Sequence, residues 1–327
     1  MSGPAPAVAA TRVAVRSELS LLPAGSTVLV GCSGGPDSLA LAAAVAFEAD
    51  RAGLTAVGVV VDHGLQPGSS RVAQTAAAHC RELGLAQVEV VRVEVVPAAG
   101  GPEEAARLAR FAALDEAADR HGAVAILLGH TRDDQAEQVL LGLARGSGSR
   151  SLSGMPRRRG LLVRPFIGVT RDETEAACAA YGVEPWQDPH NDDTSFTRVR
   201  ARALLRELER ELGPGVRAAL ARSAEMIRED ADHLEDEARS LREAIGPTPW
   251  AVSTMLAVPR ALRTRLWRIL AVEAGSGAGQ LSSAHVESLD ALLTCWHGQG
   301  PLQLPGHVRA SRSGDLVRIV ALEPAAS

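Results

Sequence analysis

Short apolar runs alternate with longer stretches of mixed polarity over the first 143 residues. The apolar runs are continuous, as in strands buried on both faces of a sheet, and they predict strands at residues 28–30, 54–64, 87–95 and 123–129. The stretches between them have helical spacing and predict an Ala/Leu-rich helix up to residue 46 and helices at 67–84, 103–121 and 133–143. This alternation predicts an α/β fold, a doubly wound parallel sheet with right-handed crossovers.

The flanking segments carry other patterns. Residues 1–10 are rich in alanine and proline and are expected to be disordered, while residues 11–22 predict a short leading helix. Glycine, proline and arginine interrupt the pattern at 144–170, which we interpret as a mobile connection or lid, with a strand expected at 161–166. A helix is predicted at 171–181, followed by a polar loop that enters an arginine-striped helix.

The last third of the chain predicts a separate, smaller unit. Residues 200–245 are strongly helical with charges of both signs, which is typical of a solvated linker helix. Beyond it we predict a small α+β unit with helices at 259–273 and 282–296 and a hairpin that turns at 313–315. The expected divisions are a leading segment (1–22), the main α/β domain (23–205), a helical linker (206–246) and a C-terminal α+β domain (247–327).

Composition narrows the class of protein. Hydrophobic residues make up 46% and charged residues 22% of the 327 residues, which is ordinary for a globular protein with a large core. The longest apolar stretches are too short to span a bilayer and no signal-peptide core is present, so we expect a cytoplasmic protein without membrane contact. The four cysteines are scattered and form no CxxC motif, which argues against a zinc or iron–sulfur site.

The net charge and the distribution of charge along the chain favour different conclusions about nucleic-acid binding. A net charge of −5 argues weakly against a general nucleic-acid binder. All 34 basic residues are arginine, however, and six of them lie between residues 145 and 164 without any acid, with four more at 198–206. Such patches on an acidic protein are typical of a selective surface for a phosphate backbone.

The turn after the first strand, SGGPDS, is the most informative stretch. Its glycines permit positive φ and let an oxyanion approach the backbone N–H groups, and its proline precedes a helix N-terminus that attracts anions. A carboxylate would repel a phosphate unless a cation accompanies it, so Asp37 suggests Mg²⁺. The alternative is a structural turn that only needs small residues. The candidate phosphate-binding residues are Ser33, Gly34, Gly35, Pro36, Asp37 and Ser38.

A second polar stretch begins where the fourth strand ends. On a helix, His130, Asp133 or Asp134, and Glu137 project from one face, and this set could hold a metal or bind an ammonium group. The alternative is a helix N-cap with a solvated Glu137. Ligands of doubly wound sheets bind beyond the carboxyl ends of the strands. The residues placed there are the turn at 33–38, Asp62, His63 and His130.

The SGGPDS turn resembles the SGGxDS loop of the PP-loop ATP pyrophosphatases, which convert ATP to AMP and pyrophosphate. Five motifs together resemble the tRNA(Ile)-lysidine synthetase family; they are SGGPDS (33–38), VDHGL (61–65), EAARLARF (104–111), GHTRDDQAEQ (129–138) and RGSGSRSLSGM (145–155). DPHND (188–192) followed by RVRAR (198–202) resembles the segment that closes the catalytic domain of that family. The close resemblance covers residues 25–205. Gln138 replaces the usual threonine and Val199 the usual asparagine, which weakens one polar contact to substrate.

The resemblance implies a ligase that converts the wobble cytidine of an isoleucine tRNA with the anticodon CAU to lysidine. The C2 oxygen of the cytidine attacks the α-phosphate of ATP and releases pyrophosphate, and the ε-amine of free L-lysine then displaces AMP. The implied cofactors are ATP and Mg²⁺, with Asp37 beside the metal, and the implied partners are the tRNA and lysine. A homodimer is a further hypothesis, and the C-terminal domain is expected to contact tRNA.

The resemblance also suggests residue roles. The implied catalytic residues are Asp37, Arg107, Arg110, Asp133, Asp134 and Glu137, and the implied ATP-binding residues are those of the SGGPDS turn with Asp62, His63 and His130. The acids of the helix would bind the ammonium groups of lysine and accept a proton. The two arginines would contact the α-phosphate, the lysine carboxylate or the tRNA, or are ordinary surface residues. We expect the arginine-rich lid to contact the tRNA backbone.

Two rival functions use the same ATP loop. A tRNA thiolation enzyme or an amidase-coupled synthetase is a different enzyme, but the chain lacks paired cysteines and an added glutaminase domain. A nucleotide-binding sensor would bind ATP without chemistry. The sensor explains the loop, but not the acids at 133–137 or the arginine-rich segment.

Overall fold

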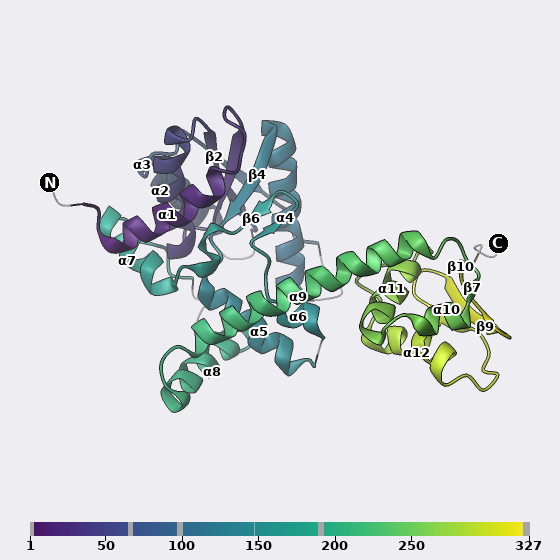
Figure 1. Ribbon diagram of the computed structural model, residues 1–327. Helices are drawn as coiled ribbons and strands as arrows, with labels where there is room; N and C mark the ends of the chain where they lie inside the picture. Colours follow the sequence, from purple (N-terminus) through teal and green to yellow (C-terminus); the bar gives the residue numbers. More distant parts are fainter. Residues whose placement is uncertain (1–2, 65–67, 97–100, 147, 189–192, 323–327) are drawn as a thin grey trace. The chain divides into compact units, whose positions relative to one another are not determined.

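The chain folds into two compact units in the computed structural model, which describes residues 3–64, 68–96, 101–146, 148–188 and 193–322 (Figure 1). The first unit comprises Met1–Ala144 and Gly154–Ala224, and the second comprises Arg145–Ser153 and Glu225–Ser327. Leu65 of the VDHGL motif and residues 189–192 of the DPHND motif lie outside the described residues.

A six-stranded sheet forms the centre of the first unit, in the order β3-β2-β1-β4-β6-β5. Its strands are β1 (Thr27–Cys32), β2 (Thr55–Asp62), β3 (Gln87–Arg92), β4 (Ala123–Leu128), β5 (Arg158–Arg159) and β6 (Leu162–Val163). All neighbouring strands are parallel except β5 and β6, which are antiparallel. The predicted parallel sheet is confirmed, with one short antiparallel edge strand added.

Helices cover both faces of this sheet. The helices of the first unit are α1 (Pro6–Leu19), α2 (Pro36–Arg51), α3 (Ser69–Glu82), α4 (Pro102–His121), α5 (Arg132–Ala144), the 3₁₀ helix η1 (Pro165–Gly168), α7 (Arg171–Tyr181) and α8 (Thr197–Leu212). Within β1, Val28 and Val30 pack into the core shared with α1, α2, α3 and α7, whereas Leu29 packs with Leu114 of α4 on the opposite face. Burial on both faces explains the continuous apolar runs and confirms a doubly wound sheet.

The strand order changes direction at β1. The chain proceeds outward from β1 through β2 to β3, and α4 then returns it to β4 on the other side of β1. Ligands of open α/β sheets bind where the connections part in this way, beyond the carboxyl ends of the two strands. The loop at 33–38 follows β1 and His130 follows β4, so the topology brings both to one crevice.

The expected disorder of residues 1–10 is contradicted by α1, which begins at Pro6. Val8 and Thr11 of this helix are buried. Proline at the first helical position and the alanines after it favour a helix start, and Val8 gains its burial only from tertiary packing.

The mobile lid expected at 144–170 is also contradicted over much of its length. Strand β6 pairs with β4, within the predicted return strand at 161–166, and both Val163 and Phe166 are buried in the core. Strands of two residues are too short to appear as an apolar run, so the glycines and arginines around them dominate the pattern.

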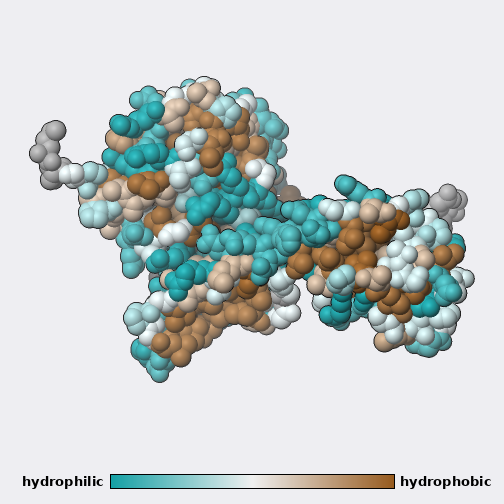
Figure 2. Space-filling view, viewed as in Figure 1, coloured by the Kyte–Doolittle hydropathy of each residue, from teal (hydrophilic) through white to brown (hydrophobic). Residues whose placement is uncertain are grey.

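Helix α8 carries arginines that line a cavity and leucines that are exposed. Arg202 and Arg206 line the cavity described below. Leucines of α5 and α8 are exposed elsewhere, and Figure 2 shows an apolar area where these two helices lie in Figure 1. The exposed leucines are Leu143, Leu204 and Leu212.

The second unit has its own sheet and core. Its strands β7 (Trp250–Ala251), β8 (Leu302–Leu304), β9 (Val308–Ser313) and β10 (Leu316–Ala321) form an antiparallel sheet in the order β7-β10-β9-β8. Its helices are α6 (Ser149–Leu152), most of α9 (Val216–Ala244), α10 (Val252–Ala257), α11 (Arg260–Glu273) and α12 (Ser283–Thr294). Trp267 and Leu289 are fully buried in this core. The predicted helices and hairpin of the C-terminal region are confirmed.

Across the described residues, no helix combines the length and the apolar character needed to cross a membrane.

Candidate active site

The loop at 33–38, which we call the phosphate loop, is a tight turn between β1 and α2. Gly34 has a φ of +84°, and a Cβ at this position would lie 3.1 Å from the Cβ of Ala76. The hydroxyl oxygen of Ser38 accepts a hydrogen bond from the backbone N–H of Ser33 at 3.2 Å and donates one to the Gly35 carbonyl at 2.9 Å. These contacts fix the loop directly before the free N–H groups of α2, where an anion is favoured.

Gly129 brings the end of β4 against this loop. A Cβ on Gly129 would lie 2.8 Å from the carbonyl oxygen of Asp37, a separation that real Cβ atoms do not show. The close approach of β4 to the start of α2 therefore requires glycine at this position. The sequence contains a signal for this role, because a glycine directly after a buried strand often marks a close backbone approach.

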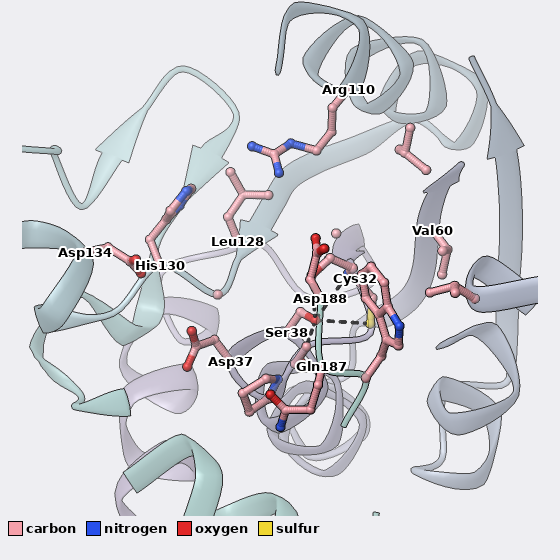
Figure 3. A pocket seen from close by; sticks show the side chains of 18 of the residues that line it. Cys32, Asp37, Ser38, Val60, Arg110, Leu128, His130, Asp134, Gln187 and Asp188 are labelled. Atoms are coloured by element: carbon pink, nitrogen blue, oxygen red, sulfur yellow. Dashed lines mark hydrogen bonds between the residues drawn. The ribbon is translucent and has the colours of Figure 1, made fainter. Parts of the chain in front are cut away.

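A cavity of about 700 Å³ opens beside the phosphate loop (Figure 3). Its volume is in the range of ligand pockets. The predicted site residues that line it are Ser33, Gly35, Pro36, Asp37, Ser38, Asp62, His63, Arg110, His130 and Asp134. Those that do not line it are Gly34, Arg107, Asp133 and Glu137. Figure 3 shows Arg110, His130 and Asp37 around the same space, although they come from three different segments.

The two histidines of the cavity carry ring nitrogens without a protein partner. In the described part of the chain, Nδ1 of His63 and Nδ1 of His130 are buried and lack a hydrogen-bond partner. Burial lowers the pKa of His130 to about 4, although the charge of Asp134 opposes this shift. Burial and the charge of Arg110 also lower the pKa of His63. Both imidazoles are therefore neutral at pH 7 and are available to hydrogen-bond a ligand.

Three acids of α5 form what we call the carboxylate cluster: Asp133, Asp134 and Glu137. Asp134 accepts hydrogen bonds from the backbone N–H and the hydroxyl of Thr131, at 2.8 and 3.0 Å. Its own backbone N–H donates to the Thr131 hydroxyl at 3.5 Å, so Thr131 caps the helix, as the alternative interpretation with Thr131 or Asp133 as N-cap expected. The solvated Glu137 of that interpretation is contradicted, because Glu137 is only 3% exposed. A buried carboxylate needs a cationic partner, and all three acids have one.

Three arginines supply the countercharge. The guanidinium of Arg171 contacts Asp134 at 3.0 Å and Glu137 at 3.5 Å. Nε of Arg202 donates to Glu137 at 2.9 Å, and Arg217 lies 3.3 Å from Asp133. Burial alone would raise the pKa of Asp134, but Arg171 and the hydrogen bond from Thr131 hold it below its ordinary value.

Arg171 also connects the carboxylate cluster to the phosphate loop. Its Nε lies 3.5 Å from Oδ2 of Asp37, and its backbone N–H donates to Asp133 at 2.9 Å. The hydroxyl of Thr174 donates to the other oxygen of Asp37. Burial raises the pKa of Asp37 to about 6, while Arg171 and Thr174 partly counteract that shift. The loop and the acids therefore face one another through a single arginine.

The described residues of this site supply only part of a ligand set for Mg²⁺, which the phosphates of a bound nucleotide would complete. Among the residues that the structure describes, no group of three or more His, Cys, Asp or Glu side chains is arranged to hold a metal. Mg²⁺ in nucleotide sites is commonly bound by one or two carboxylates together with phosphate oxygens and water. Asp37, at the edge of the phosphate loop, fits such a partial ligand set.

Several arginines that were predicted to contact substrate or tRNA contact other side chains of the protein. Arg107 and Arg110 both lie near the ring of Phe111, at 5.5 and 5.4 Å, but only Arg110 lines the cavity. Arg158 of the expected lid pairs with Glu18 of α1 at 2.8 Å. Arg150 pairs with Asp232 at 2.5 Å inside the second unit.

Arg171, Thr174 and Arg217 are the contacts that the sequence did not reveal. Arg171 and Thr174 lie in a predicted helix, and Arg217 lies in the charged helical region, where a surface role is the ordinary expectation. No local pattern distinguishes them, because their role depends on contacts with Asp37 and α5, which lie at least 37 residues away in the chain.

Comparisons with known proteins agree with this geometry. The PP-loop domain model matches residues 11–209, and the model of the TilS substrate binding domain matches residues 251–317. The chain is 55% identical to the tRNA(Ile)-lysidine synthase of Thermobifida fusca, over 95% of this chain and 97% of that protein. It is 49% identical to the tRNA(Ile)-lysidine synthase of Salinispora arenicola, over 98% of each chain.

A solved structure supports the fold. The U34-tRNA thiolase NcsA from Methanococcus maripaludis matches with a TM-score of 0.58 and 19% identity, covering 68% of this chain and 80% of that one. At this identity the likeness concerns the arrangement of strands and helices alone.

Proposed function

The chain belongs to the tRNA(Ile)-lysidine synthase family, and on this basis we propose that it is a ligase that uses ATP to join lysine to C2 of the wobble cytidine of isoleucine tRNA with the anticodon CAU. The contacts of Arg171 are the structural observation that best supports this proposal. Arg171 contacts Asp37 beside the phosphate loop and also Asp134 and Glu137 of the carboxylate cluster. These contacts support an ATP site and an amine site that would meet at one crevice.

The first step activates the base. The C2 oxygen of cytidine attacks the α-phosphorus of ATP, the bond to the β-phosphate breaks, and pyrophosphate leaves. The backbone N–H groups of the phosphate loop and its two serines would stabilise the charge of the leaving pyrophosphate. Mg²⁺, held by Asp37 and the phosphates, would neutralise further charge when bound. Arg110 and the neutral His130 line the cavity and would contact the nucleotide.

The second step forms the carbon–nitrogen bond. The ε-amine of lysine attacks C2, the bond between C2 and the activated oxygen breaks, and AMP leaves with that oxygen. The amine loses its proton, which the acids Asp134 and Glu137 would accept or relay. Asp134, which lines the cavity, would also hold an ammonium group of lysine before attack, and Asp133 and Glu137 behind it would add negative charge.

The proposal includes the larger partners. Arg202 and Arg206 of α8 line the cavity and would meet tRNA phosphates near the splayed cytidine. The second unit, matched by the substrate binding domain model, would bind another part of the tRNA. The exposed leucines of α5 and α8 would support a homodimer. A reaction that consumes ATP and acts on tRNA would take place in the cytoplasm.

The rival functions lack comparable support. A sensor that binds ATP without chemistry needs no buried carboxylate cluster beside the loop. A thiolation enzyme needs reactive sulfur, and of the four cysteines, all within the described residues, Cys32 alone lines the cavity. The curated relatives named above carry the synthase name over nearly the whole chain.

A reconstituted reaction tests the proposal. Purified protein with ATP, Mg²⁺ and the CAU-anticodon isoleucine tRNA is expected to release at most one pyrophosphate per tRNA without lysine, and to release AMP only when lysine is also present. Mass spectrometry of the tRNA nucleosides should then show lysidine at the wobble position. Asp37→Ala is expected to abolish this product, because it removes the carboxylate beside the phosphate loop. An unmodified cytidine after incubation with the wild-type protein would contradict the assignment.

A further inference from the structure

Arg171 occupies a position that no other cation of the described residues shares. It is the first residue of α7, whose start is fixed by a capping box between Thr170 and Glu173. From there the guanidinium reaches Asp37, Asp134 and Glu137, and the backbone N–H reaches Asp133. The side chain is 20% exposed and lines the cavity. Arg171 is thus both a counterion of the acids and part of the wall that a ligand meets.

The charges around it are nearly balanced. Asp37 and the carboxylate cluster supply four negative charges when ionised, and Arg171, Arg202 and Arg217 supply three positive charges in contact with them. The neighbouring His130 is neutral, because its pKa lies at about 4. Within the described residues, Arg171 is the cation that pairs with Asp37 and Asp134, so its removal would leave two carboxylates that line the cavity without an ion pair.

Lysine and a diamine of the same chain length differ in net charge by one unit. Free lysine carries two ammonium groups and one carboxylate, so its net charge is +1. The diamine of the same chain, 1,5-diaminopentane, lacks the carboxylate and carries +2. A guanidinium in the wall attracts a carboxylate and repels a second ammonium group, so it favours the amino acid over the diamine.

We propose that Arg171 is a specificity-determining residue, which makes the amine site select an amino acid of net charge +1 over a diamine of net charge +2. The inference rests on the proposed function and adds to it the residue that sets the charge of the accepted amine. Arg202 and Arg217 contribute less, since among the described residues Arg202 pairs with Glu137, and Arg217 divides its contacts between Asp133 and Glu209.

Competition between the two amines tests this role. The full chain is incubated with ATP, Mg²⁺, CAU-anticodon isoleucine tRNA, lysine and 1,5-diaminopentane, and mass spectrometry separates the two adducts by the mass of the missing carboxyl group. Arg171→Gln is expected to shift the product ratio toward the diamine by at least about tenfold, because it removes a unit charge a few ångströms away. Arg171→Lys keeps the charge and should shift the ratio much less.

A matched control comes from Arg206, which lines the same cavity but makes no ion pair within the described residues. Arg206→Gln removes the same charge from the chain and should leave the ratio within about twofold, because it does not contact the acids. Glu137→Gln removes a negative charge instead. It should shift the ratio in the opposite direction, away from the diamine.

The outcomes separate this inference from the function on which it rests. If wild-type protein forms lysidine but Arg171→Gln leaves the ratio unchanged, the role of Arg171 is overturned and the function stands. If the wild-type protein forms no lysine adduct, the function itself fails. Should Arg171→Gln form neither product, calorimetric dissociation constants for the two amines must show the same shift. If this variant does not fold, as judged by circular dichroism, Arg171→Met replaces it, because methionine keeps the apolar part of the side chain, and an unchanged ratio in that variant overturns the role.

Discussion

The phosphate loop and the carboxylate cluster meet at one crevice but are built in opposite ways. The loop uses six consecutive residues, small side chains and short hydrogen bonds within the turn. The cluster uses long charged side chains, and its partners come from α7, α8 and α9. A site built from backbone geometry is determined by consecutive residues and can be predicted from them. A site built from ion pairs forms only after distant segments have packed together.

Gly34→Ala should break the loop half of this comparison and have the largest effect. The substitution strains a φ of +84° and places a Cβ 3.1 Å from Ala76, so the backbone N–H groups must shift. The rate of tRNA-dependent pyrophosphate release is expected to fall about 100-fold, as expected for reacting groups displaced by about an ångström. Gly53→Ala is the matched control, because Gly53 has a φ of +67° with open space around it. Equal losses in both variants would refute the role of the contact.

The pH dependence should sharpen the comparison at Asp37, where the two halves meet. Burial raises the pKa of Asp37 to about 6, so the carboxylate is mostly protonated below this pH and cannot bind a cation there. Pyrophosphate release at saturating tRNA is expected to fall about tenfold from pH 7 to pH 5, since each pH unit below the pKa reduces the ionised fraction tenfold. Asp37→Asn should be slow, with a flat profile over this range. A wild-type profile without a step near pH 6 would contradict this assignment.

Arg202→Gln should weaken the cluster while leaving the loop intact, and its effect should be the smallest. Glu137 loses its 2.9 Å hydrogen bond but keeps Arg171 at 3.5 Å, so the free energy of unfolding should fall by about 1 kcal/mol. Urea unfolding of the full chain measures this change. Arg206→Gln, four residues further along α8, is the control and should change the stability by less than about 0.5 kcal/mol. A larger loss in the control would show that α8 does not act through Glu137.

Most of the fold could be predicted from the sequence, because its main strands are buried on both faces. Strands β1, β2, β3 and β4 each appear as an apolar run. The helices between them indicate right-handed crossovers, which connect parallel strands of one sheet. Strand β6 lies within the strand predicted at 161–166, whereas β5 was not predicted, since two residues are too few to form an apolar run. The start of α1 at Pro6 was missed because composition outweighed the burial of Val8.

The candidate site divides along the same line. The phosphate loop was predicted residue by residue because glycine, serine and proline determine the turn themselves. Asp134 and Glu137 were predicted from their spacing on one helix, although Glu137 proved buried rather than solvated. Arg171, Thr174 and Arg217 could not be predicted, since an arginine or threonine on a helix has no local mark that distinguishes a buried partner from a surface residue.

The cations that surround the acids are all guanidinium groups, those of Arg171, Arg202 and Arg217. A guanidinium stays protonated at any working pH and has no free electron pair with which to attack carbon, whereas a nearby primary amine could lose its proton and do so. A base activated in this crevice would therefore encounter no counterion of the acids that is able to imitate the incoming amine. Guanidinium counterions would protect the activated base from attack where ammonium counterions would not.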